Sequence, residues 1–206
     1  MTLLQFAIGA LNDVQDRHAD RLSKPAKPIP AGSVPVGGAR LVAAGAAVLG
    51  LVLAAPSGWL VLGLALVVLA IGGLYDLALK GTAWSWVPFA IGIPLLPVYG
   101  WLGAADGLPV LFVVLIPVGV LEGAALATAN ALVDVERDRE AGVASVATTL
   151  GRRVSGVVVL VLQAAVGGAA VVTAVGLGAP PAWLALVAGA SLIMVAGAVM
   201  TAPSGA

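Results

Sequence analysis

Long apolar stretches separated by short polar segments make up most of the chain. A membrane-spanning helix needs about 20 predominantly apolar residues, and several stretches approach or exceed this length. Six of them lie at about residues 40–55, 59–75, 84–102, 108–132, 154–175 and 183–201. Residues 1–20 look like the end of a further helix, because only eleven residues precede Asn12. The pattern predicts an all-α fold, a polytopic transmembrane helical bundle of about seven helices.

The polar segments predict loops. Residues 22–38 hold Pro25, Pro28, Pro30 and Pro35. Proline removes a backbone hydrogen-bond donor and breaks helices, so this segment is predicted to connect two helices rather than to extend one. A second polar segment, residues 134–153, holds eight of the twenty charged residues of the chain. We interpret residues 1–206 as a single transmembrane domain.

Composition supports a membrane protein and excludes other classes. Charged residues make up 10% of the chain, against about 25% in soluble domains, and the mean hydropathy is +1.10. The net charge of zero provides no basic field for nucleic acid. The absence of cysteine excludes disulfides and thiolate metal sites.

The basic residues predict the orientation of the bundle. If the predicted spans alternate in direction, all of the Lys and Arg residues fall on one side of the membrane. They are Arg17, Arg21, Lys24, Lys27, Arg40, Lys80, Arg137, Arg139, Arg152 and Arg153. The positive-inside rule then predicts a multi-pass protein, in the cell (inner) membrane, with this charged side facing the cytoplasm.

The densest group of charges lies in residues 12–32. Asn12, Asp16 and Asp20 recur every four residues, so on a helix they share one face, about one turn (~5.4 Å) apart. Carboxylates stacked in this way repel one another unless a cation lies between them. Oxygen ligands of this kind suit Mg²⁺, which often joins carboxylates to substrate phosphates.

A second acidic group repeats this spacing. Asn130, Asp134 and Asp138 lie at an equivalent helix end, on the same predicted side of the membrane. One charged run alone is usually a solvated loop, but the repetition favours a functional interpretation. Two groups of carboxylates can hold Mg²⁺ on a diphosphate while basic side chains bind the remaining oxygens. An apolar cavity beneath them would take a hydrophobic tail, so ionisation of an allylic diphosphate would give a carbocation sheltered from water.

These motifs resemble the UbiA superfamily of intramembrane polyprenyltransferases. The relevant patterns are N-D-x-x-D-R-x-x-D at residues 12–20, K-P-x-K-P-I-P-A-G at 24–32, D-x-x-x-D-x-x-x-G at 134–142 and T-x-L-G at 148–151. Tyr75 and Lys80 resemble the family's Tyr and Lys between the two acidic motifs. The resemblance covers nearly the whole chain.

The resemblance implies a Mg²⁺-dependent prenyltransferase. It would transfer a polyprenyl group from an allylic prenyl diphosphate to an aromatic or other small acceptor in the lipid bilayer, releasing diphosphate. The implied ligands of Mg²⁺ and diphosphate are Asp16, Asp20, Asp134 and Asp138. Asn12 would support them. Asn130, from the repeated spacing, is a further candidate for substrate binding, and the candidates for diphosphate oxygens are Lys24, Lys27, Lys80, Arg137 and Arg139. Lys27 stands where the family commonly has Arg, which keeps the charge but loses the planar fork.

Two candidates have a structural alternative. Tyr75 could stabilise a cation or could be an interfacial aromatic residue. Glu122 lies inside an apolar stretch, where ionisable residues are costly and usually face the bundle interior. It could line the acceptor pocket or act as a base, or it could be a structural Glu paired with another helix.

Three further expectations concern the chain as a whole. Family members generally have nine helices, so the first and last helices are expected to be absent. The acceptor could be aromatic or of the phosphoglycerol type. The alternative function is that of a non-catalytic membrane protein, either an ion or solute carrier or a partner subunit. Transporters usually bind coupling ions near the bilayer midplane, whereas the carboxylates here are predicted at one membrane surface.

Overall fold

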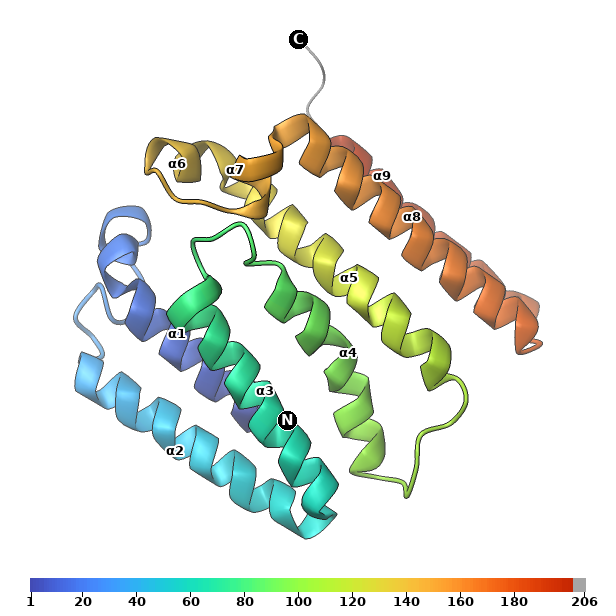
Figure 1. The fold of residues 1–206 in the computed structure, drawn as a ribbon, viewed down its shortest axis with the longest axis horizontal. Coiled ribbons are helices and arrows are strands. Elements are labelled where there is room, and N and C mark those ends of the chain that lie inside the picture. Colours follow the sequence, from blue (N-terminus) through green and yellow to red (C-terminus); the bar gives the residue numbers. More distant parts are fainter. Residues whose placement is uncertain (202–206) are drawn as a thin grey trace. The chain divides into compact units, whose positions relative to one another are not determined.

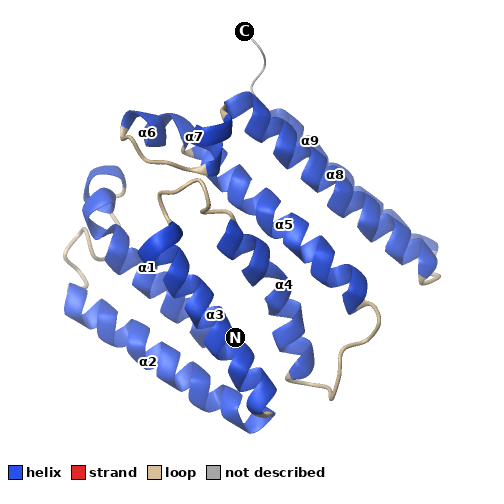
Figure 2. Ribbon diagram, viewed as in Figure 1, coloured by secondary structure: helices blue, strands red, loops and turns tan. Residues whose placement is uncertain are grey.

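The computed structural model describes residues 1–201 as an all-helical protein, which confirms the predicted fold class. The described helices are α1 (Thr2–Ser23), α2 (Val36–Ala54), α3 (Trp59–Leu74), α4 (Val87–Leu102), α5 (Phe112–Val133), α6 (Val135–Glu140), α7 (Val146–Leu150), α8 (Arg152–Gly176) and α9 (Pro181–Thr201). Figure 2 shows these helices joined by short loops. Seven of the helices in the described part correspond to the six predicted apolar stretches and to the predicted helix at residues 1–20. The short α6 and α7 were not predicted, because they lie within the charged run.

Four of the described helical segments are long and apolar enough to cross a membrane. They are Val36–Ser57, Trp59–Leu79, Phe112–Val133 and Arg152–Gly176, and the helices Val87–Leu102 and Pro181–Met194 are shorter but also apolar. The first and second segments extend α2 and α3 by a 3₁₀ turn (Ala55–Ser57) and a π-helical turn (Tyr75–Leu79). The chain is therefore a multi-pass integral membrane protein.

The described residues form two compact units. The N-terminal unit contains residues 1–78 and 95–108, and the C-terminal unit contains residues 79–94 and those from 109 onward. The first half of α4 thus belongs to the C-terminal unit and its second half to the N-terminal unit. The interpretation of the chain as one domain stays a prediction.

In the N-terminal unit, α1, α2 and α3 lie side by side (Figure 1). Its buried core consists of Leu4, Ala54, Val61, Ala65 and Val68. Small residues permit the close approach of these helices, as is common in membrane bundles. A Cβ added at Gly72 would lie 2.6 Å from a side-chain carbon of Ile8. Glycine at this position lets α1 pack directly on the backbone of α3.

In the C-terminal unit, α8 lies between α5 and α9, and α6 and α7 follow the carboxyl end of α5 (Figure 1). Gly123 of α5 lies against the backbone of Phe89 and Ala90 in α4, where no Cβ could be accommodated. The chain reverses after α6 through Gly142, which has a φ of +68°. α7 then begins with a capping box, in which Ser145 and Thr148 satisfy each other's backbone N–H groups. The charged run is thus an ordered helical segment rather than an open loop.

Candidate active site

The first acidic motif lies on the carboxyl half of α1. This helix is uninterrupted from Thr2 to Ser23, so Asn12, Asp16 and Asp20 occupy successive turns as the four-residue spacing predicts. Asn12 and Asp16 are half-buried, and Asp20 is buried with 4% of its surface exposed. A buried carboxylate needs a compensating charge or hydrogen bonds.

The loop after α1 supplies that charge. The proline-rich segment folds into successive turns, in which the N–H of Ala31 donates to the carbonyl of Lys27 at 2.9 Å and that of Val34 to the carbonyl of Pro28 at 3.1 Å. Gly32 has a φ of +75°, a conformation that glycine adopts without strain. The prediction of a loop at residues 22–38 is therefore correct for most of the segment, with α1 ending at Ser23 and α2 beginning at Val36.

Lys27 bridges two carboxylates of α1 from this loop. Its Nζ donates to Oδ2 of Asp20 and to Oδ1 of Asp13, both at 2.8 Å. The hydrogen bonds to Asp13 and Asp20 raise the pKa of Lys27 to about 12. Lys27 thus neutralises part of the charge of the motif and fixes the loop against α1. Because a carboxylate has two oxygens, Asp20 retains Oδ1 for a further ligand.

The end of α3 adds a third polar group to the N-terminal unit. The helix changes from α to π geometry over Tyr75–Leu79, a form often found at functional sites. Tyr75 is half-buried, and the neighbouring Asp76 is buried with 8% of its surface exposed. Lys80, which follows this turn, is half-buried and already belongs to the C-terminal unit.

The second acidic motif has a different backbone setting. α5 ends at Val133 and α6 begins at Val135, so Asp134 stands at the junction, with a φ of −100° and a ψ of 2°. The expected ladder of Asn130, Asp134 and Asp138 therefore does not run along one continuous helix. The N–H of Asp138 still donates to the carbonyl of Asp134 at 2.8 Å, which keeps one helical turn between the two carboxylates. Asn130 is exposed on the last turns of α5.

Local ion pairs surround this motif. Arg137 Nη2 lies 2.8 Å from Oδ2 of Asp134, and Arg139 Nη1 lies 2.9 Å from Oε2 of Glu136. Burial and the neighbouring charge of Asp134 raise the pKa of Asp138, while Arg137 lowers it. Arg137 therefore lies beside the acidic motif, whereas Arg139 pairs with a residue outside it.

Glu122 lies deeper in α5, where it contacts α8. Its Oε2 accepts a hydrogen bond of 3.2 Å from Nε2 of Gln163. Both side chains are half-buried within apolar helices. The structure therefore contains the contact expected under the structural alternative, in which Glu122 pairs with another helix.

Each of the two units brings some of the predicted residues together. The N-terminal unit brings together Lys27 and Asp20, while the C-terminal unit brings together Asp134, Asp138 and Arg137. Lys24 is exposed at the end of α1. Four residues of these surroundings were not predicted as site residues, namely Asp13, Glu136, Asp76 and Gln163. An acidic or amide side chain at or inside an apolar stretch is the signal that could have identified the last two.

The donor chemistry fits Mg²⁺. Among the described residues, no three His, Cys, Asp or Glu side chains are grouped as a metal site. Each acidic motif nevertheless provides two carboxylates one helical turn apart. Mg²⁺ is commonly bound by one or two protein carboxylates, with waters and substrate phosphates as its other ligands. Asp16 and Asp20 in one unit, and Asp134 and Asp138 in the other, meet this requirement.

Several solved structures share the fold of this chain. The chain is similar in fold to an apo UbiA homolog from Aeropyrum pernix K1, with a TM-score of 0.80 and 21% identity over 96% of this chain and 76% of that one. It is also similar to a digeranylgeranylglyceryl phosphate synthase structure, with a TM-score of 0.70 and 20% identity over 97% and 73% of the two chains. A UbiA homolog from Archaeoglobus fulgidus bound to Cd²⁺ gives a TM-score of 0.65 and 18% identity over 97% and 72%.

No curated protein sequence matches the chain significantly. The UbiA prenyltransferase family matches residues 1–205, which is nearly the whole chain. The chain therefore belongs to the UbiA prenyltransferase family.

Proposed function

We propose that the protein transfers a polyprenyl group from an allylic prenyl diphosphate to a small acceptor, in a reaction that depends on Mg²⁺. The observation that carries this proposal is the pair of acidic motifs with the same four-residue spacing, in a chain of the UbiA family. A diphosphate bears several negative charges, and its departure requires their neutralisation. The acidic motifs with their basic neighbours are the groups in this chain that suit such a leaving group.

The roles of the side chains follow from their charge. Asp16, Asp20, Asp134 and Asp138 hold Mg²⁺, and Asn12 and Asn130 support them as neutral oxygen donors. When bound, Mg²⁺ supplies positive charge to the diphosphate oxygens. The remaining oxygens are taken by basic side chains, for which Lys24, Lys27, Lys80, Arg137 and Arg139 are the candidates.

The reaction breaks one bond and forms another. The bond between the allylic carbon and the diphosphate oxygen breaks, and both electrons leave with diphosphate. The allylic cation is then captured by a nucleophilic carbon or oxygen of the acceptor, which loses a proton. Tyr75 contributes an electron-rich ring that stabilises the cation. An apolar environment keeps water from capturing the cation first.

Glu122 is proposed to act at the acceptor. Its hydrogen bond with Gln163 fixes the direction of its carboxyl group within the apolar helices. A carboxylate in this setting can accept the proton that the acceptor loses, or can hold the acceptor by a hydrogen bond. The bilayer supplies the apolar substrate, and the basic residues favour a cytoplasmic orientation of the acidic motifs.

A transfer assay tests this function. The protein, reconstituted in lipid vesicles, is given radiolabelled geranylgeranyl diphosphate and Mg²⁺, with a panel of aromatic and phosphoglycerol acceptors. We expect label to move to an acceptor of one class, with equimolar release of diphosphate. If the protein is folded and binds the labelled diphosphate but releases none with any acceptor, it is a non-catalytic member of the family or a carrier.

A further inference from the structure

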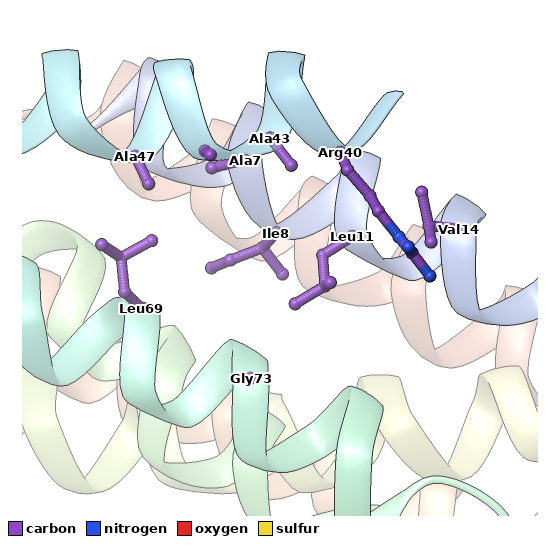
Figure 3. A pocket seen from close by; sticks show the side chains of 10 residues that line it. Ala7, Ile8, Leu11, Val14, Arg40, Ala43, Ala47, Leu69 and Gly73 are labelled. Atoms are coloured by element: carbon purple, nitrogen blue, oxygen red, sulfur yellow. The ribbon is translucent and has the colours of Figure 1, made fainter. Parts of the chain in front are cut away.

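An apolar cavity of about 350 Å³ lies within the N-terminal unit, among α1, α2 and α3. Figure 3 shows its lining, which includes Ile8, Leu11, Ala43, Ala47, Leu69 and Gly73. The cavity follows α1 from Ala7 to Val14, a length of about 10 Å at the helical rise per residue. The alanines of α2 and Gly73 of α3 leave this space between the helices. Its walls are almost entirely hydrocarbon.

The cavity is separate from the proposed active site. None of the residues that we assign to the prenyl transfer lines it. Leu11 faces the cavity, and on α1 the side chains of Asn12 and Asp16 project about 100° and 140° away from that of Leu11. The acidic face of α1 is therefore turned away from the cavity.

Arg40 marks one end of this cavity. Its side chain reaches from α2 toward Val14 of α1, as Figure 3 shows. Arg40 is exposed, and it forms no ion pair or side-chain hydrogen bond with the residues that the structure describes. It is the fifth residue of α2 and lies near the amino-terminal end of this helix, just after the proline-rich loop. The cavity thus combines an apolar slot with an uncompensated guanidinium near the expected membrane surface.

We propose that this cavity binds an anionic phospholipid, with one acyl chain in the slot and the phosphate on Arg40. The hydrocarbon walls exclude polar ligands and accept an alkyl chain. A guanidinium binds phosphate oxygens through two parallel hydrogen bonds. Basic pockets between membrane helices at the cytoplasmic side are suited to anionic headgroups. Charge complementarity therefore favours an anionic lipid over a zwitterionic one.

Spin-labelled lipids measure this binding directly. The protein is placed in phosphatidylcholine nanodiscs with a trace of spin-labelled phosphatidylglycerol or phosphatidylcholine, and the immobilised fraction gives the relative affinity. We expect a preference for phosphatidylglycerol that Arg40→Gln lowers about fivefold. The matched control is Arg153→Gln, which removes the same charge. Arg153 is also exposed at the start of an apolar helix. An equal loss in the control would overturn the proposal in favour of a general charge effect.

Filling the cavity tests the acyl chain. Gly73 lines the cavity and Gly63 lies on the same helix outside it, and a Cβ added at either position meets nothing within 4 Å. Gly73→Leu should reduce immobilisation of the labelled phosphatidylglycerol at least fivefold, whereas Gly63→Leu should leave it unchanged. Ala47 also lines the cavity, so Ala47→Leu replaces Gly73→Leu as the filled variant if the latter does not fold. Unchanged binding in a folded filled variant would contradict the assignment.

Two competitors identify the occupant. Glycerol phosphate has the headgroup without the chain and should not displace the labelled lipid. Displacement by geranylgeranyl diphosphate, lost in Gly73→Leu, would show that the cavity belongs to the substrate and would overturn the proposal.

Discussion

The two acidic motifs share a four-residue spacing but differ in how the fold compensates their charge. On α1 the motif lies on one continuous helix, and its buried Asp20 is paired with Lys27 from a loop seven residues later. At the α5–α6 junction the helix is interrupted at Asp134, and the cation is Arg137, three residues away. The first arrangement requires the loop to fold in one way, whereas the second forms within a single turn. Equal spacing in sequence therefore does not imply equal dependence on the surrounding structure.

Removal of one carboxylate from either motif tests whether both are needed. Asp16→Asn and Asp138→Asn should each lower kcat at least about 100-fold, because each removes a charge that offsets the leaving diphosphate. Both substitutions keep the size of the side chain and one acceptor oxygen, so circular dichroism should show an unchanged helical content. Full Mg²⁺-dependent activity in both variants would exclude the proposed site.

Removal of the cation that pairs with each motif should lower the free energy of unfolding more for the first motif than for the second. Lys27→Ala leaves the buried Asp20 without its partner and should destabilise the protein by about 2 kcal/mol, a value reduced because Lys27 itself is 31% exposed. Arg137→Ala breaks a pair whose side chains are 52% and 41% exposed and should cost less than about 1 kcal/mol. Unfolding of both variants in mild detergent measures the difference, and equal losses would contradict the comparison.

The same cation should respond to alkaline pH. The pKa of Lys27 is raised to about 12 in the folded protein, against about 10.4 in an unfolded chain. Its contribution to stability is therefore fully present below about pH 10 and is lost as the pH rises through 12. Lys27→Arg should remove this alkaline loss and keep most of the stability, since arginine stays protonated. An unchanged alkaline limb in that variant would show that another group titrates.

Asp138 should control the acid limb of activity. Burial and the charge of Asp134 raise the pKa of Asp138, and Arg137 opposes this rise. Because the proposed role needs the carboxylate, activity should fall as the pH drops through that raised pKa. Arg137→Gln removes the cation that lowers the pKa of Asp138, so the acid limb of activity should move to higher pH. This shift is separate from any loss of kcat at the optimum pH. A shift to lower pH would mean that Asp138 is not the titrating group.

The smallest effect is expected at Glu122. Glu122→Gln can keep a hydrogen bond to Gln163, so it should fold normally but lower kcat/KM about tenfold if the carboxylate serves the acceptor. Gln163→Leu is the paired control, because it removes the fixed orientation but keeps the carboxylate. Wild-type rates in Glu122→Gln would leave Glu122 with the structural role alone.

Hydropathy and spacing predicted much of this fold and part of its candidate site. The apolar stretches located the long helices to within a few residues, since a lipid-exposed segment must satisfy its backbone hydrogen bonds internally. The spacing of Asn12, Asp16 and Asp20 predicted their shared helix face correctly. The same argument did not predict the interruption at Asp134, because a charged segment outside the apolar stretches has no periodic pattern that distinguishes one helix from two.

Contacts between distant residues were the hardest to predict. Lys27 was expected to bind diphosphate oxygens, but its fourteen-residue separation from Asp13 gave no sign of the ion pair that the loop creates. The pairing of Glu122 with Gln163 spans forty-one residues and depends on which faces of α5 and α8 meet. Such contacts are set by helix packing, which composition and periodicity leave undetermined.

Diphosphate release, compared between the wild-type chain and variants of one or both motifs, shows whether the acidic motifs carry the proposed reaction. Vesicles containing the wild-type chain, Asp16→Asn, Asp138→Asn or the double variant would receive prenyl diphosphate, a mixture of acceptors and either Mg²⁺ or a chelator. We predict release by the wild-type chain with Mg²⁺ only, and a double variant no slower than the worse single variant, because the proposed function assigns both motifs to the same leaving group. Release by the double variant at the wild-type rate would contradict the account.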